Sequence, residues 1–252
     1  MLNIGTRLIL PLLSVTAMAG ASAAQERRPA ETRAVPIDLV CAPQAALALP
    51  SQALRITGGP EPSKALFAAG DTVFINAGTA QGLEPGQRYF ARRIVEDRFA
   101  VRTTESIPRS VHTGGWITIT GAQADIATAR VGEACDGVIE GDYLEALVLP
   151  PVAVATDGGA PDFERPARVI LADDRRQLGT GGGSLMVLDR GTDHGLRPGQ
   201  RLTVFRRALN GSGPIVAIGD AFVATTQAET SVIRIEKSRE EVQVGDLVAI
   251  HR

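Results

Sequence analysis

Short stretches in which apolar and polar residues alternate recur along this chain, and clusters of turn-forming residues separate them. Alternation with a period of two indicates half-buried β-strands. It predicts strands in the first half at 72–76, 87–95, 116–120, 126–131 and 138–144, and in the second half at 185–189, 201–205, 221–224, 232–235 and 247–250. No longer segment combines a helical period with capping residues at both ends. We therefore expect an all-β protein.

One stretch of the chain occurs twice. Gly78–Arg88 returns 113 positions later as Gly191–Arg201, with glycine, leucine, proline and arginine in the same places. A later correspondence has a spacing of 104 positions and matches Gly141–Asp142 with Gly245–Asp246. Repetition over this length predicts two copies of one module. The change in spacing places a deletion of nine residues in a surface loop of the second copy.

The repeated residues are those of a tight turn between two strands. Asn76 and Asp189 end the preceding strands, where their short side chains can accept hydrogen bonds from free backbone N–H groups. Leu83 and Leu196 are expected to close one end of each core, and each proline precedes a glycine in the order typical of a β-turn. Positive φ angles or close backbone approaches are expected at six glycines: Gly78, Gly82, Gly86, Gly191, Gly195 and Gly199.

The ends of the modules follow from composition. Arg7, an apolar run at 8–21 and the small residues at 21–24 are typical of a cleaved secretory signal peptide, and the run is too short for a comfortable membrane span. Prolines and a Gly pair mark a linker between the repeats. The expected fold is all-β, with two tandem small β-barrel (SH3-like) modules joined by this Pro/Gly linker. The expected organisation is signal peptide 1–24, extended lead segment 25–51, module 52–149, linker 150–166 and module 167–252.

Composition narrows the classes of partner and of chemistry. The formal net charge is −2 and the basic residues are scattered, which argues against nucleic acid as a partner. His112, His194 and His251 lack metal-ligand spacing, and the acidic pairs lack the spacing of a calcium loop. The repeat contains no nucleophile paired with a base. We therefore expect no enzyme activity, no cofactor, no bound metal and no transmembrane span in the mature chain.

The chain has two cysteines, Cys41 and Cys135. In an exported protein such a pair indicates one disulfide, here between the lead segment and the far end of the first module. Two buried free thiols are the alternative. The signal peptide and the even cysteine count together predict a periplasmic or secreted, Gram-negative-like protein.

A small group of aromatic residues is the candidate binding surface. Tyr89, Phe90 and Trp116 fall on neighbouring predicted strands, and the position equivalent to Trp116 in the second copy is Asp220. A Trp at the start of a strand more often packs on the barrel or its neighbour, which is the favoured interpretation for Trp116. The alternative is an exposed aromatic surface for a glycan or a peptide groove, because interfaces favour Trp and Tyr.

A family resemblance rests on the stretch from Gly70 to Gly78, on Gly82-Leu83-x-x-Gly86, on Ala129-Arg130-Val131 and on Gly141–Asp142. This pattern resembles the small β-barrel modules that follow LysM domains in exported bacterial proteins, and a similar module in the C-terminal part of flagellar assembly protein T. The resemblance covers both repeats, whereas no LysM domain is recognisable in this chain. It implies a non-enzymatic role in the cell envelope.

Two functions follow as hypotheses. The first is a periplasmic scaffold or assembly module that contacts envelope proteins through barrel edges and loops. The second is a module that binds peptidoglycan or another carbohydrate. The places where the two copies differ are expected to hold the functional information.

Overall fold

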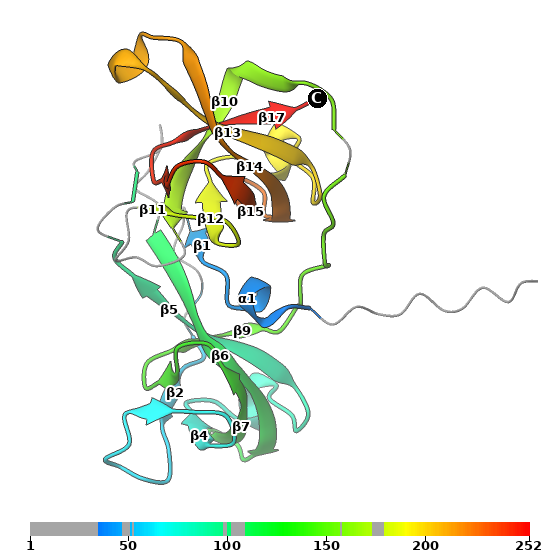
Figure 1. Cartoon of the computed structure of the whole chain (residues 1–252). Coiled ribbons are helices and arrows are strands. Elements are labelled where there is room, and N and C mark those ends of the chain that lie inside the picture. Colours follow the sequence, from blue (N-terminus) through cyan, green and yellow to red (C-terminus); the bar gives the residue numbers. More distant parts are fainter. Residues whose placement is uncertain are drawn as a thin grey trace, which may run out of the picture. The chain divides into compact units, whose positions relative to one another are not determined.

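The computed structural model describes residues 35–46, 51, 53–97, 100–101, 109–156, 158–172 and 179–252 (Figure 1). The predicted signal peptide and most of the predicted lead segment therefore lie outside the described residues. The all-β class is confirmed, because a single four-residue α-helix, α1 (Ile37–Val40), stands among the strands of the described part. Each of the ten predicted strands overlaps a strand of the structure. No helix of the described residues is long and apolar enough to cross a membrane.

The first module is a strongly curled sheet. Six strands follow one another in the order β2-β4-β7-β6-β5-β9, and β1 adds to the outer part of β6. A bridge between Arg55 and Tyr143 joins the two ends of the sheet, and β3 pairs with β8 beside it. The strands are β1 (Gln44–Ala46), β2 (Ile56–Gly58), β3 (Leu66–Phe67), β4 (Thr72–Ile75), β5 (Arg88–Val95), β6 (Arg109–Ala122), β7 (Ala127–Ala134), β8 (Val138–Ile139) and β9 (Tyr143–Ala146).

The second module is a closed barrel of six strands in the order β10-β12-β15-β14-β13-β17. Its first strand begins at Pro161, so the last part of the segment expected as linker is already paired with β17. The strands are β10 (Pro161–Ala172), β11 (Gly179–Thr180), β12 (Leu185–Leu188), β13 (Arg201–Arg207), β14 (Ile215–Thr226), β15 (Ser231–Ser238), β16 (Val242–Gln243) and β17 (Leu247–His251).

Each module has its own core of β-branched and small apolar residues. In the second module Val204, Val223, Ile233 and Val248 are completely buried, and the first module is filled in the same way by residues of β4, β6 and β7. Burial alternates along strands such as β4 and most of β7, whereas consecutive residues of β13 and β17 are buried on both faces. Leu83 and Leu196, each 1% exposed, belong to the two cores as the sequence predicts.

The repeated stretch has the same local structure in both copies. A short 3-10 helix, η1 (Thr79–Gln81) or η2 (Thr192–His194), is followed by a glycine in the left-handed region, with φ 82° at Gly82 and 80° at Gly195. Gly78 is extended, yet a Cβ there would lie 1.9 Å from the carbonyl oxygen of Gln123. Glycine is therefore required at Gly82 by conformation and at Gly78 by the close approach of the neighbouring turn.

Candidate functional site: two equivalent ribbons with different surroundings

In both modules one hairpin extends past the sheet as a two-stranded ribbon. In the first module β5 and β6 pair through Ile94 with Val111 and one pair further, and in the second module β13 and β14 pair as far as Arg207 with Ile215. The first member of each pair differs by 113 positions and the second by 104, which are the two spacings of the repeat. The ribbons therefore occupy equivalent positions in the two repeats of the sequence.

An arginine and a buried aspartate hold the base of each ribbon. Arg93 of β5 donates to both carboxylate oxygens of Asp142 at 3.0 Å, and the same carboxylate accepts the Ile139 N–H. In the second module Arg206 Nε and Nη2 donate to Asp246 at 2.6 and 2.8 Å, and Asp246 accepts the Gln243 N–H. The two arginines are also 113 positions apart, so the repeat spacing identifies this pair, which is not among the site residues predicted from the sequence.

Burial shifts the pKa of the aspartate in the first pair, and hydrogen bonding shifts the pKa of the arginine in the second. The Asp142 side chain has no exposed surface, and burial raises its pKa although Arg93 and the Ile139 N–H favour the charged form. The hydrogen bond from Arg206 to Asp246 raises the pKa of Arg206. Because the same ion pair recurs with the same backbone contact, its role is to fix the ribbon on the barrel.

The outer edge of the first ribbon is covered. Strand β1 lies antiparallel to β6, with Gln44 opposite Val111 and Ala46 opposite Arg109. On the other side of β1, Ala45 packs with Ile170, Leu171 and Val187 of the second module, together with Ala100 and Val101. The backbone N–H of Val101 donates to the carbonyl oxygen of Ile170 at 3.2 Å. Both the edge and the apolar surface near the tip of this ribbon are therefore occupied within the chain.

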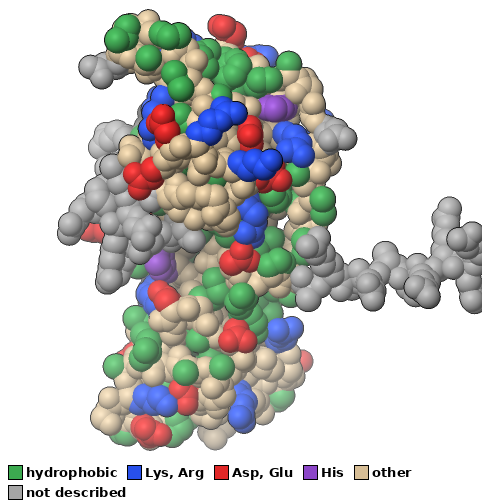
Figure 2. All heavy atoms as spheres, viewed as in Figure 1, with side chains coloured by type: hydrophobic (Ala, Val, Ile, Leu, Met, Phe, Trp, Pro, Cys, Tyr) green, Lys and Arg blue, Asp and Glu red, His purple; other side chains and the backbone are tan. Residues whose placement is uncertain are grey.

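The second ribbon has no such cover among the described residues. Strand β14 pairs with β15 only from Gly219 onward, and β13 pairs with β17 only as far as Phe205. The segment Ile215–Ala217 therefore has β13 on one side and no strand on the other. Its exposed apolar residues are Leu209, Ile215 and Val216, which are 77, 37 and 43% exposed. Figure 1 shows the ribbon in orange beyond the barrel, and Figure 2 shows hydrophobic side chains gathered at this end.

Leu209 has an unusual backbone conformation at the tip of this ribbon. It opens the 3-10 turn η3 (Leu209–Gly211) with a φ of 51°, the one positive φ at a non-glycine residue in the described part of the chain. A left-handed conformation costs about 1–2 kcal/mol for a residue with a Cβ. The exposed side chain recovers none of this by burial in the folded chain. A strained and exposed leucine at a ribbon tip points to a function outside the fold itself.

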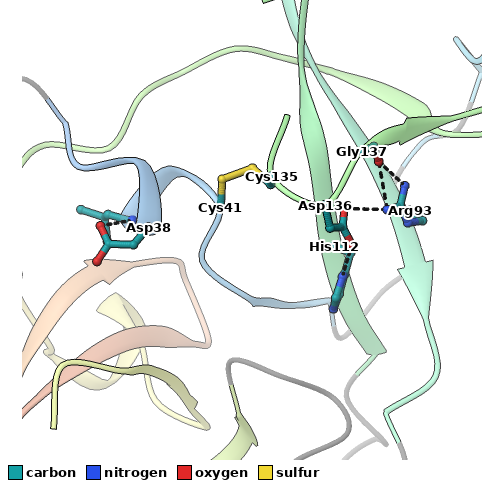
Figure 3. The surroundings of a disulfide bond; sticks show 8 residues. Asp38, Cys41, Arg93, His112, Cys135, Asp136 and Gly137 are labelled. Atoms are coloured by element: carbon teal, nitrogen blue, oxygen red, sulfur yellow. Dashed lines mark hydrogen bonds and ion pairs between the residues drawn. A yellow bond between two sulfur atoms is a disulfide. The ribbon is translucent and has the colours of Figure 1, made fainter. Parts of the chain in front are cut away.

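The disulfide between Cys41 and Cys135 is confirmed (Figure 3). Cys41 follows α1 and Cys135 follows β7, and their Cα atoms are 5.7 Å apart. On the opposite side of α1, Leu39 and Ala42 pack with Leu185, Ala224 and Val232 of the second module. Asp38 also pairs with Arg234 at 2.8 Å. The bond therefore anchors to the first module a segment that also contacts the second one.

The structure separates the three aromatic residues of the candidate binding surface. Tyr89 and Phe90 are consecutive on β5, so they point to opposite faces of the sheet. Phe90 is 3% exposed and lies beneath the Arg92 guanidinium, 4.3 Å from its ring centre. Trp116 is opposite Phe90 on β6 and is half-buried, whereas Tyr89 packs against the core of the first module. These residues do not form one continuous exposed aromatic surface.

Each histidine takes part in a local contact. His112 Nδ1 lies 3.3 Å from Asp136, His194 Nδ1 lies 3.4 Å from the Gly191 N–H, and His251 Nε2 lies 2.8 Å from the Thr203 hydroxyl. Burial lowers the pKa of His251. Among the residues with described positions, no three His, Cys, Asp or Glu side chains are grouped so that they could hold a metal ion. These contacts are those of turns and strand ends.

No protein-family model matches the chain, and no curated protein matches it. Its function has to be argued from its own geometry. Several apolar side chains are exposed in the described part of the chain, and those of the β13–β14 ribbon differ in lying beside a strand edge that no described strand covers.

Proposed function

We propose that the chain is a non-enzymatic, exported protein of the bacterial cell envelope that acts as a scaffold by binding protein through the β13–β14 ribbon. The observation that carries the proposal is the exposure of Leu209, Ile215 and Val216 near the tip, the last two on opposite faces of a ribbon whose equivalent in the first module is covered. Covering such residues is the usual function of a protein–protein contact. The disulfide supports an oxidising compartment.

The size of the exposed patch indicates a contact of modest strength. Burying a Leu, Ile or Val side chain completely contributes about 1.5–3 kcal/mol, and two of these three side chains are already more than half covered. The tip alone therefore supplies only a few kcal/mol, and the entropy of association opposes it. A reversible assembly contact fits this balance better than a permanent complex.

Binding of peptidoglycan or another carbohydrate is less well supported. A glycan platform needs aromatic faces open to solvent, whereas Phe90 is buried and Tyr89 lies on the other face of the sheet from Trp116. If glycan binding is nevertheless the function, purified sacculi will retain the wild-type protein and release the Trp116→Ala variant.

Photocrosslinking in living cells tests the protein-binding proposal. A photoreactive amino acid replaces Leu209 in one variant and Leu66 in a control variant, since Leu66 is also exposed (56%) but lies in the first module. We expect a discrete protein adduct from position 209 and none from position 66.

A second pair of variants distinguishes contact from misfolding. Leu209→Ser should weaken recovery of the adducted protein in a pull-down with chemical crosslinking, with an unchanged melting temperature, whereas Leu66→Ser should not weaken it. Absence of any adduct at position 209, or equal adducts at both positions, would refute the proposal.

A further inference from the structure

We propose that the protein bound by the β13–β14 ribbon is a second copy of this chain, with the two β14 edges paired antiparallel around a two-fold axis at Ile215. The inference rests on the proposed function and names its partner. It concerns the backbone edge at Ile215–Ala217, where β14 has no second neighbour among the described residues.

The first module shows that this edge accepts a strand. Val111 of β6 is equivalent to Ile215 of β14 at the 104-residue spacing. Val111 has Ile94 on one side and Gln44 of β1 on the other, in antiparallel pairing. Three residues of β1 are enough to complete the edge there. The equivalent edge of the second module therefore has the geometry to take an antiparallel strand as well.

The hydrogen-bonding pattern shows which groups of β14 face outward. Ala208 N–H donates to the carbonyl oxygen of Pro214 at 3.0 Å, so the next pair, Arg207 with Ile215, occupies a non-hydrogen-bonded position. The N–H and C=O of Ile215 consequently point away from β13. The Ala217 carbonyl, two residues further, also faces outward, since it accepts a hydrogen bond from Arg239 at 3.3 Å.

The residues of the β14 edge are suited to pairing with the same edge of a second copy of the chain. Proteins protect strand edges with charged residues or proline; the segment 213–217 contains Pro214 but no charged residue, and the Arg239 guanidinium lies at its Ala217 end. Antiparallel pairing of two such segments places no like charges opposite each other. With the axis at Ile215, the outward N–H and C=O of each copy bond to those of the other. The axis also makes the contact close on itself, which is the commonest arrangement of homo-oligomers.

The remaining strands of the barrel support this choice of surface. Within the described residues each of the six barrel strands is paired on both sides along its central part. Among the described residues, the ribbon edge at Ile215–Ala217 lacks a second strand and also carries exposed apolar side chains, although the Arg239 side chain bonds the Ala217 carbonyl at one end. Because so few residues pair, the dimer belongs to the weak, reversible class of interfaces.

Sedimentation over a concentration series tests the inference with the mature, disulfide-bonded chain. We expect the mass to rise from monomer towards dimer across the micromolar range. Ile215→Pro removes the outward N–H from both copies, and since each hydrogen bond contributes about 0.5–1.5 kcal/mol, dissociation should increase roughly tenfold. Ile215→Val retains the N–H and most of the side chain, so it should dimerise like the wild type.

A crosslink gives a second readout that does not depend on proline. In H-bonded antiparallel pairs the Cα atoms are about 5.5 Å apart, a distance that a disulfide can span. Ile215→Cys should therefore form a covalent dimer under mild oxidation. Ile126→Cys should stay monomeric, because Ile126 is similarly exposed (44%) but lies in a turn of the first module.

The outcomes separate this inference from the proposed function. A chain that is monomeric at every concentration, or a dimer that Ile215→Pro leaves unchanged, overturns the second copy as partner. If a monomeric chain still gives an adduct with another protein at position 209, the proposed function stands and only this inference fails. If neither association nor an adduct is found, both fail.

Discussion

Removing the disulfide is the sharpest test of how the first module is stabilised. The variant replaces both Cys41 and Cys135 with Ser, so that no free thiol remains. The bond joins residues 94 positions apart, across β1 to β7. A cross-link lowers the conformational entropy of the unfolded chain by an amount that grows with the logarithm of the number of residues in the enclosed loop. For a loop of this length the lost entropy corresponds to about 4.5 kcal/mol of stabilisation at 25 °C.

The observed loss should be somewhat smaller than this. The lead segment keeps its pairing of β1 with β6 and the packing of Leu39 and Ala42, so the native state itself is retained. We expect a loss of about 2–4 kcal/mol in the free energy of unfolding. For a chain of this size that corresponds to a fall of roughly 5–15 °C in melting temperature.

Trp116 is the single tryptophan, so its fluorescence follows the first module during guanidinium unfolding. Circular dichroism follows both modules in the same titration. Wild-type protein kept reduced is the matched control, and it should unfold at the same guanidinium concentration as the double-serine variant. A loss below about 1 kcal/mol by Trp116 fluorescence would refute the argument that this cross-link stabilises the module.

Three further predictions address the repeated turn and the ribbon base. Gly191→Ala should lower the free energy of unfolding by more than about 3 kcal/mol or prevent folding, because its Cβ would lie 2.2 Å from a carbonyl oxygen. The Cβ of Gly195→Ala would face open space, so only the left-handed backbone opposes it, and chemical denaturation should show a loss of about 1–2 kcal/mol. Arg206→Ala leaves the buried Asp246 carboxylate unpaired and should cost about 3 kcal/mol, against less than about 0.5 kcal/mol for the exposed Arg207→Ala, and equal losses would contradict this. Burial raises the pKa of Asp142 above 3.8 in the folded state, so this carboxyl stabilises the fold most at acid pH and loses that contribution as pH rises through the raised pKa. The difference in the free energy of unfolding between wild type and Asp142→Asn should change between pH 3.8 and the raised pKa of Asp142. At higher pH this difference should be constant.

The sequence predicts the local structure well because the repeat is made of local signals. All ten expected strands overlap strands of the structure, located by alternation or, as at Leu185–Leu188, by a short apolar run between turns, and the glycines identify the turns that Gly78 and Gly82 form. The polar residues at the strand ends behave in the same way in both copies. Asn76 accepts the Arg55 N–H at 2.7 Å, and Asp189 accepts the Arg168 N–H at 2.8 Å. Such contacts join segments close enough in sequence for residue types to reveal them.

The strands without alternation could not be located in the same way. Strand β10 passes from the predicted linker into the barrel, and its buried residues Ala167–Ala172 form a nearly continuous apolar run with bulges. Strand β1 is three residues long, and its partner β6 is far away in the sequence. The aromatic candidates were placed by strand proximity alone. Which face each side chain occupies depends on register, and register depends on contacts with other strands.

The difference between the two ribbons has a simple origin in the duplication. The two repeats provide two equivalent ribbon edges, at Val111 and at Ile215, whereas the described part of the lead segment contains one strand, β1, which covers the first. The disulfide fixes that strand beside the first edge, since Cys41 lies just before β1 and Cys135 just after β7. The second edge keeps the same backbone geometry, without charged residues that would repel a neighbouring strand. An edge that the repeat creates and no described strand covers is where a partner strand can pair with the outward N–H and C=O groups of Ile215.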